Sequence, residues 1–156
     1  MKKIWISIKK FFGWKPKVTP TPRNNFMEWG LEEQEIGALI SIARDENRRN
    51  SMVGMKQIIA NQLLWYEARK RCSIQTGRSS ISHDGVGEAF TRLTEEGYKD
   101  PAEILGYGYT SAEAVVDAWL KSSSHKRIIL NPLHTHFGVG RLVKEGKYYY
   151  CVLFAK

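Results

Sequence analysis

Long apolar runs are absent from this sequence, and none approaches the about 18 residues that a membrane-spanning helix needs. Cysteine is scarce as well: Cys72 and Cys151 are the only two, and they form no CxxC or zinc-ribbon spacing. One disulfide and two buried free thiols are both compatible with such a pair. No internal repeat is present. The sequence therefore predicts neither a membrane span nor a zinc ribbon nor a repeat protein.

Acidic charge is missing from one end of the chain. Residues 1–17 contain six lysines and no Asp or Glu, so subtracting them from the formal net charge of +8 leaves only +2 for residues 18–156. A nucleic-acid-binding domain would spread Lys and Arg over a folded face. We therefore expect no specific nucleic acid among the partners.

The first residues lack the features of a complete secretion signal. Their apolar stretch is shorter than the roughly 7–15 residues that a signal needs, and no small-residue cleavage site follows. Ile4, Ile8, Phe11 and Phe12 instead have helical spacing, with lysines beside them. Residues 1–17 thus predict a basic amphipathic segment for an anionic membrane surface or a groove on a partner protein. A disordered basic tail is the alternative.

Proline is concentrated just after this segment. Residues 16–25, PKVTPTPRNN, hold three of the five prolines, and this density disfavours helix and sheet and favours an extended spacer. The predicted organisation is a basic segment at 1–17, a Pro-rich linker at 18–30 and one folded domain at 31–156.

Apolar spacing in the folded domain predicts helices first. One helix is expected from Leu31 to Ala43, ending at the polar run RDENRRN. A second helix is expected to carry an apolar face and to have Cys72 near its end. The residues of that face are Ile58, Ile59, Leu63, Leu64 and Ala68.

Two shorter helices are expected after the second one. The first covers residues 87–96 and stops at Gly97 in a left-handed cap. The other opens at a capping box formed by Thr110 and Glu113. The residues of this helix that should face the core are Val115, Val116, Trp119 and Leu120.

The pattern changes to strands at Phe137. FGVGRLV and YYYCVLFA around the turn KEGK predict a β-hairpin. Gly138 and Gly140 indicate close packing or a bulge in a strand, and they lack the context of a nucleotide-binding loop. Helices followed by a terminal hairpin indicate an α+β fold.

All four histidines lie in one part of the chain, at His83, His125, His134 and His136. Histidine is the commonest metal ligand and the usual acid–base side chain near neutral pH. Their clustering therefore points to a site, although any one of them alone is more often a surface or core residue.

The order of several motifs resembles the bacterial branch of the CAP superfamily, named for cysteine-rich secretory proteins, antigen 5 and pathogenesis-related 1. The similarity covers roughly residues 33–156. It is carried by SHDG at 82–85, Arg92 with Gly97-Tyr98, Glu103, YGYTSAEAVV at 107–116, Trp119-Leu120, Ser122, His125, Ile129 to Pro132 and Gly138 to Gly140.

This resemblance implies an α-β-α sandwich, with a small central, mostly antiparallel sheet flanked by helices. It also implies a cleft of two histidines and two acids that can bind a divalent metal such as zinc or calcium. By position, the cleft residues are similar to His83, Glu103 and His125.

The family's second acid falls on Ser122, and two of its asparagines fall on Ile104 and Ile128, so the cleft is partly degenerate. His134 and His136 are candidates for additional ligands, and the alternative is that they are surface residues beside the sheet.

Three functions follow from this resemblance. The first is a non-enzymatic module that binds a lipid, a small apolar ligand or a partner. The second is a structural component of a viral particle or cell envelope, docked through residues 1–17. The third is a hydrolase with His83 or His125 as base and Glu103 orienting it, although no clear nucleophile accompanies them. The family implies an extracellular or envelope location, and a virion is the alternative.

Overall fold

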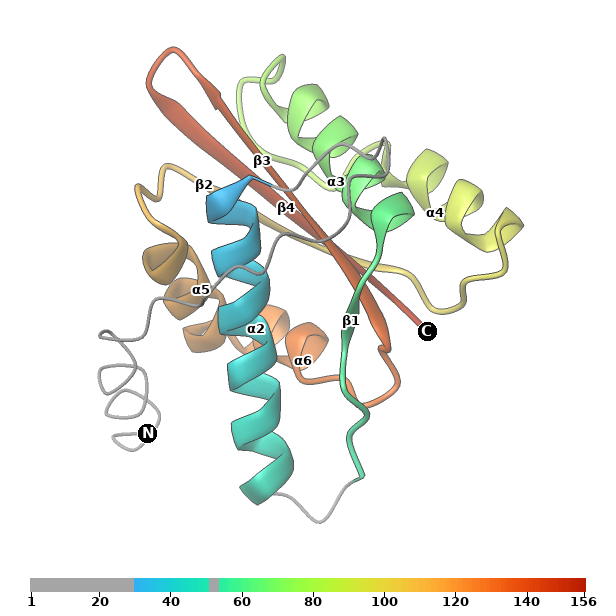
Figure 1. Cartoon of the computed structure of the whole chain (residues 1–156). Helices are drawn as coiled ribbons and strands as arrows, with labels where there is room; N and C mark the ends of the chain where they lie inside the picture. The colour runs from blue at the N-terminus through green and yellow to red at the C-terminus, as the bar shows by residue number, and fades with distance from the viewer. Residues whose placement is uncertain (1–29, 51–53) are drawn as a thin grey trace.

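A computed structural model describes residues 30–50 and 54–156, so the predictions for residues 1–17 and for most of the linker lie outside the described residues (Figure 1). The described part contains five helices and four strands. They are α2 (Leu31–Asn50), β1 (Ile59–Ala60), α3 (Gln62–Gln75), α4 (Val86–Glu95), β2 (Ala102–Tyr107), α5 (Ala112–Lys121), α6 (Ser123–Ile129), β3 (His136–Lys144) and β4 (Lys147–Ala155).

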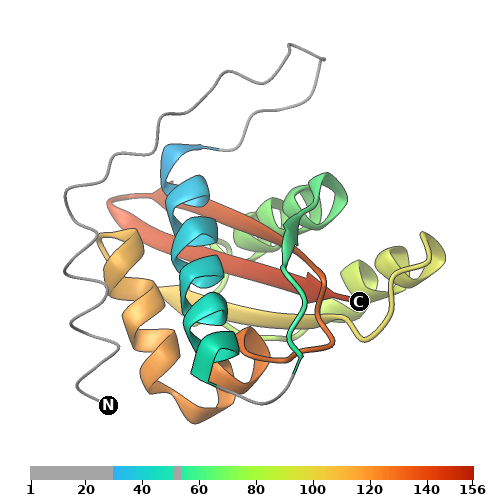
Figure 2. The ribbon, with the colours of Figure 1, turned by 60° about the horizontal axis from the view of Figure 1, so that its bottom comes forward.

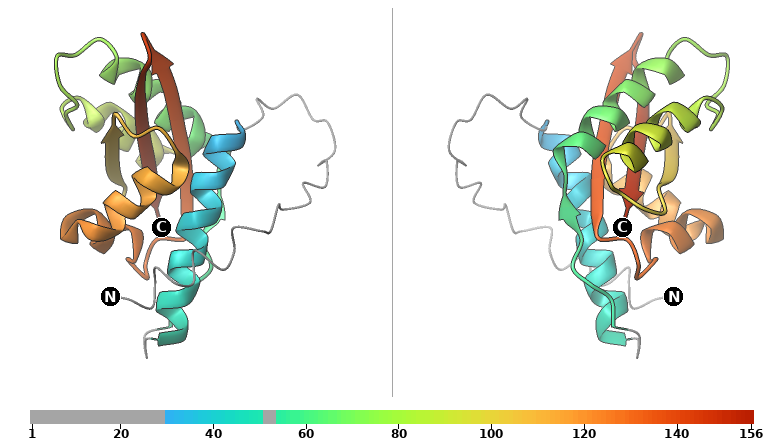
Figure 3. Two further views of the ribbon diagram at one scale, coloured as in Figure 1. Left: turned by 90° about the vertical axis from the view of Figure 1, so that its left-hand side faces the viewer. Right: turned by 90° about the vertical axis from the view of Figure 1, so that its right-hand side faces the viewer.

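The four strands form one sheet in the order β1-β3-β4-β2. The β3–β4 and β2–β4 pairs are antiparallel, and only the short β1 runs parallel to β3. Helices α3 and α4 cover one face, whereas α2, α5 and α6 cover the other (Figure 2, Figure 3). The predicted α-β-α sandwich with a mostly antiparallel sheet is therefore confirmed.

Strand β4 is buried on both faces, which explains its nearly continuous apolar sequence. Tyr150, Val152 and Phe154 pack toward α2 and α5, whereas Cys151 and Leu153 pack toward α3. The hairpin turn places Glu145 and Gly146 at φ 51° and 70°, the left-handed region that a two-residue type I′ turn requires. The predicted hairpin is confirmed.

Helix α3 approaches β3 too closely for any side chain between them. A Cβ on Gly138 would overlap the backbone of Leu64 and Trp65, and a Cβ on Gly140 would overlap the backbone of Ala68. These glycines serve close packing, as the sequence predicts.

The N-terminal ends of α2 and α3 are joined by a buried carboxylate. Glu33 accepts hydrogen bonds from Trp65 Nε1 at 3.0 Å, Arg69 Nε at 2.8 Å and Arg141 N at 3.0 Å. Burial alone would raise the pKa of Glu33, but the bonds from Arg69, Trp65 and the backbone outweigh it, so the pKa is lowered. This network holds α3 against α2 and β3.

The shorter helices follow the predictions with small shifts. Gly97 has φ 92°, and Tyr98 N donates to Leu93 O at 3.0 Å, so the left-handed stop of α4 is confirmed. The cap of α5 is one residue later than predicted: Ser111 Oγ, and not Thr110, accepts from Ala114 N at 3.2 Å. The predicted inward face of α5 is confirmed, because Val115, Val116 and Trp119 are buried and the half-buried Leu120 packs against the same cluster.

Two predictions for the first helices are wrong. Helix α2 continues through the polar run to Asn50, where Arg48 pairs with Asp45 at 3.2 Å, and Leu31 is 75% exposed rather than on the core face. Ile58 and Ile59 do not belong to α3: Ile58 precedes strand β1 and Ile59 lies in it, because Asn61 caps α3 by accepting from Leu63 N and Leu64 N.

Both cysteines are free and fully buried. Cys72 Sγ donates to Gly140 O at 3.2 Å, and Cys151 Sγ donates to Glu103 Oε2 at 3.4 Å. Burial raises the pKa of each thiol, and the nearby charge of Glu103 raises the pKa of Cys151 further. Of the two alternatives for this pair, a disulfide or two buried free thiols, the structure contains the free thiols. Among residues 30–50 and 54–156, every helix is either too short or too polar to span a bilayer.

Candidate functional site

Glu103 lies on β2 and is bound by an arginine that the sequence did not single out. Arg71, on α3, donates from Nε to Glu103 Oε2 at 2.6 Å and from Nη2 to Oε1 at 3.0 Å. The side chains of Arg71 and Glu103 are only 2% and 1% exposed. This is the fork geometry in which a guanidinium binds both oxygens of a carboxylate.

The charges of this pair depend on each other. Burial alone would lower the pKa of Arg71, but its hydrogen bonds to Glu103 and the charge of that carboxylate outweigh burial, so the pKa of Arg71 is raised. Removing either partner would leave an uncompensated buried charge. The Arg71–Glu103 pair is thus a fixed unit beneath the surface.

His83 connects this buried pair to the surface. It lies in the segment between α3 and α4, its Nδ1 is 2.9 Å from Glu103 Oε1, and 59% of its side chain is exposed. The structure therefore brings His83 and Glu103 into direct contact.

His125 lies on α6 and is half-buried. Burial lowers the pKa of His125, and its electrostatic interaction with His83 lowers that pKa further. Both effects favour the uncharged form of the His125 ring.

The other two histidines interact elsewhere. His134 is 2% exposed and precedes β3; its ring stacks on Phe154 with centroids 5.5 Å apart, and Nδ1 lies 3.2 Å from Ile128 O. The expectation of a surface residue is wrong for His134, because this packing buries it. His136 begins β3 and meets Tyr98 edge-on, with ring centroids 5.4 Å apart.

The described residues fit a divalent metal poorly. Within residues 30–50 and 54–156, no group of three His, Cys, Asp or Glu side chains is arranged to hold an ion. Both oxygens of Glu103 accept hydrogen bonds from Arg71, and Ser122, at the position of the family's second acid, bonds to Ser124 Oγ at 3.1 Å. A closed zinc site needs four ligands, and calcium needs six to eight oxygens.

Arg71 could have been found from helical spacing. It follows Leu64 and Ala68 on the face of α3 that also carries Cys72, so a charged residue stands at a core position. A buried arginine requires an acidic partner, and that requirement was the available signal.

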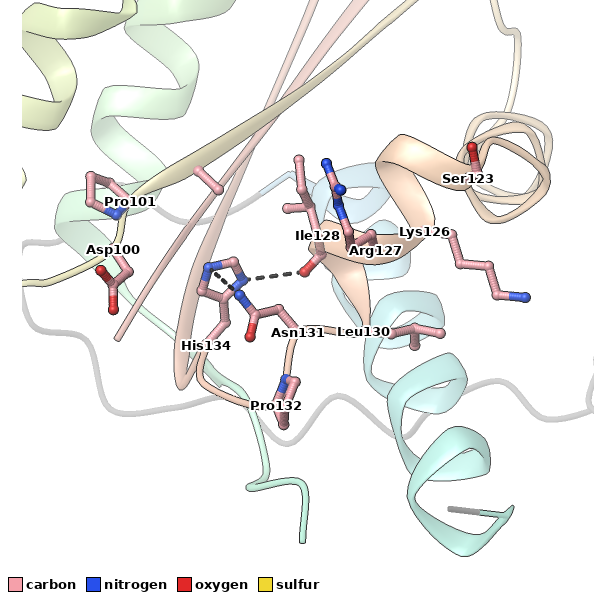
Figure 4. Close-up of a pocket in the computed structure, with 11 residues that line it drawn as sticks. Asp100, Pro101, Ser123, Lys126, Arg127, Ile128, Leu130, Asn131, Pro132 and His134 are labelled. Carbon is pink, nitrogen blue, oxygen red and sulfur yellow. Dashed lines mark hydrogen bonds between the residues drawn. The ribbon is translucent and has the colours of Figure 1, made fainter. Parts of the chain in front are cut away.

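A groove of about 830 Å³ lies apart from the His83–Glu103 contact (Figure 4). Helix α6, the start of β2 and the loop before β3 form its walls, and the His134 ring lies between Ile128 O and Asn131 within it. Its lining is Asp100, Pro101, Ala102, Ser123, Lys126, Arg127, Ile128, Leu130, Asn131, Pro132 and His134. His83, Glu103 and His125 are not among them.

The three-layer sandwich and the buried Glu103 beneath an exposed His83 define a CAP-type domain. Residues 65–154 match the family model of CAP, the cysteine-rich secretory protein family. This matched segment is more than half of the chain. This chain therefore belongs to the CAP family.

Two curated relatives come from Bacillus subtilis (strain 168). The uncharacterized protein YkwD is 31% identical over 98 residues, which is 60% of this chain and 38% of that protein. The uncharacterized membrane protein YlbC is 40% identical over 58 residues, 35% of this chain and 16% of that protein. This chain thus corresponds to well under half the length of either relative.

Solved structures share the fold. An outer surface protein from Borrelia burgdorferi has a TM-score of 0.70 at 20% identity, over 86% of this chain and 98% of that one. An extracellular protein containing an SCP domain from Bacillus anthracis has a TM-score of 0.67 at 22% identity, over 80% of this chain and 40% of that one. At such identities the likeness shows the fold alone.

Proposed function

We propose that this CAP domain is a non-catalytic binding module whose cleft at His83 and His125 takes a lipid, a small apolar ligand or a partner segment. The observation that carries the proposal is that Glu103 is already bound by another side chain of the protein. Its two oxygens are held by Arg71 at 2.6 and 3.0 Å, so the carboxylate has little capacity left for a metal ion.

Hydrolysis is less well supported because, among the described residues, neither His83 nor His125 is paired with a nucleophile. In the part of the chain that the structure describes, no Ser, Thr or Cys side chain is hydrogen-bonded to His83 or His125. Cys151, which donates to Glu103, is fully buried and has a raised pKa, so it is a poor source of thiolate. An imidazole held by a carboxylate then remains a binding group rather than half of a catalytic pair.

Assembly at an envelope or particle surface is the second candidate. Its support is the name of one structural neighbour, an outer surface protein, together with the six lysines of residues 1–17. In this arrangement the basic segment docks to a neighbouring protein instead of to lipid.

Vesicle sedimentation separates these proposals. Full-length protein should pellet with anionic phosphatidylglycerol-containing vesicles at low salt and be largely released at about 0.5 M salt, because salt screens lysines that each contribute about 1 kcal/mol near an anionic surface. Replacing Lys2, Lys3, Lys9 and Lys10 by Glu should abolish pelleting, and neutral vesicles serve as the control.

One result would remove lipid from this proposal, and another would contradict the binding module itself. Full-length protein that stays in the supernatant at low salt would move docking to a partner protein ahead of lipid association. Turnover of a p-nitrophenyl ester that is lost in both His83→Ala and His125→Ala would replace the binding module by a hydrolase.

A further inference from the structure

We propose that Arg71 is the positioning residue of the cleft: it fixes both Glu103 and the loop that carries His83, so that His83 presents Nε2 to the ligand. This inference rests on the proposed function only in taking the His83 cleft as the place where a ligand binds.

A single guanidinium joins the strand and the loop. Besides its two bonds to Glu103, Arg71 donates from Nη1 to Asp84 O at 3.2 Å and from Nη2 to Ser82 O at 3.3 Å. These carbonyls belong to the residues immediately before and after His83. Arg71 therefore holds the main chain on both sides of the imidazole and the carboxylate that the imidazole contacts.

Other side chains from the same part of the chain support the loop. Gln75 donates from Nε2 to Ser82 O at 2.8 Å and accepts from Ser82 N at 2.9 Å. Arg78 donates from Nη2 to Asp84 O at 3.1 Å. Of these three side chains, Arg71 is the one that also reaches β2, so it decides where the ring stands relative to Glu103.

The pairing also selects the His83 tautomer. An ion-paired carboxylate has only acceptor oxygens, so the 2.9 Å contact requires His83 Nδ1–H to donate to Glu103 Oε1. When the ring is uncharged, Nε2 then carries the lone pair, on a side chain that is 59% exposed. The matching ligand group is a hydrogen-bond donor, such as a hydroxyl or an amide N–H.

Lysine cannot take over this role completely. Arg71 uses three nitrogens in a planar fork to reach four acceptors on two segments. An ammonium group is a single point charge on a flexible stem. Lysine at this position should keep the ion pair with Glu103 and lose most of the hold on the loop.

The ¹⁵N chemical shifts of the His83 ring test the proposal in full-length protein, at a pH where the ring is uncharged and its two tautomers can be distinguished. The wild-type ring should be predominantly in the Nδ1–H tautomer. Arg71→Met should lose that preference, and Arg71→Lys should restore part of it. Arg92→Met is the matched control, since Arg92 pairs with a different buried carboxylate, that of Glu67, at 3.0 Å and does not touch the cleft.

Three outcomes would overturn the proposal: a wild-type ring in the Nε2–H form, an Arg71→Met ring unchanged from wild type, or an equal change in Arg92→Met. If Arg71→Met does not fold, the wild-type and Arg71→Lys spectra decide. Vesicles that leave the His83 shifts unchanged would count against the cleft as the lipid-binding site, while the mutant comparison would still decide the role of Arg71.

Discussion

Replacing Gly138 by Ala should prevent the full-length protein from folding. The new Cβ would overlap three main-chain atoms of α3 at Leu64 and Trp65, and none of them belongs to a flexible side chain that could move away. Relief requires α3 to separate from β3, which would also pull Arg71 from Glu103. We expect a cost comparable with the whole stability of an ordinary domain, about 5–15 kcal/mol. Soluble yield, circular dichroism and urea melts measure it.

Gly87→Ala is the control for this substitution. Gly87 lies in α4, and a Cβ there would meet no atom within 4 Å. Alanine should stabilise the helix by roughly 0.5–1 kcal/mol. A Gly138→Ala protein that melts like Gly87→Ala would show that α3 does not pack against β3 as described.

Trp119→Ala should cause the second-largest loss, about 3–5 kcal/mol for truncating a buried Trp. Trp119 is 2% exposed, packs in the cluster with Val115 and Val116, and donates from Nε1 to Leu105 O at 2.8 Å. The truncation therefore leaves both a cavity and a buried carbonyl without its donor. The difference in the free energy of unfolding, from urea melts, measures the effect.

Two variants separate these contributions. Trp119→Phe retains most of the packing and removes the donor, so its cost should be intermediate. Ile74→Ala, at a residue 36% exposed on α3, should cost much less. A cost below about 1 kcal/mol for Trp119→Ala would mean that α5 faces the sheet differently from the structure.

Elements with strong local signals could be predicted from the sequence. The hairpin has a Gly-bearing turn between two apolar runs, and α5 has an apolar face at helical spacing. β1 could not be predicted in this way, because two residues have no periodicity. Its conformation depends on distant pairing with His136 and Phe137 and on the Asn61 cap that starts α3 beyond it.

The candidate site was only partly accessible from the sequence. His83, Glu103 and His125 were found through a family resemblance, whose motifs preserve their order. Arg71 belongs to no such motif: helical spacing places it on the core face of α3, but its pairing with Glu103 depends on how α3 packs on the sheet. The burial of His134 likewise comes from stacking on Phe154. These two residues are far apart in the sequence, and no local pattern indicates their contact.

The most direct test of the role of Glu103 is a crystal structure from crystals grown in the presence of zinc, with anomalous data collected at the zinc edge. We expect Glu103 to remain bonded to Arg71 and His83, with no zinc shared by His83, Glu103 and His125. A zinc ion within about 2.0–2.2 Å of the Glu103 carboxylate and both imidazoles, with Arg71 displaced, would contradict the non-metal binding cleft and establish a metal site instead.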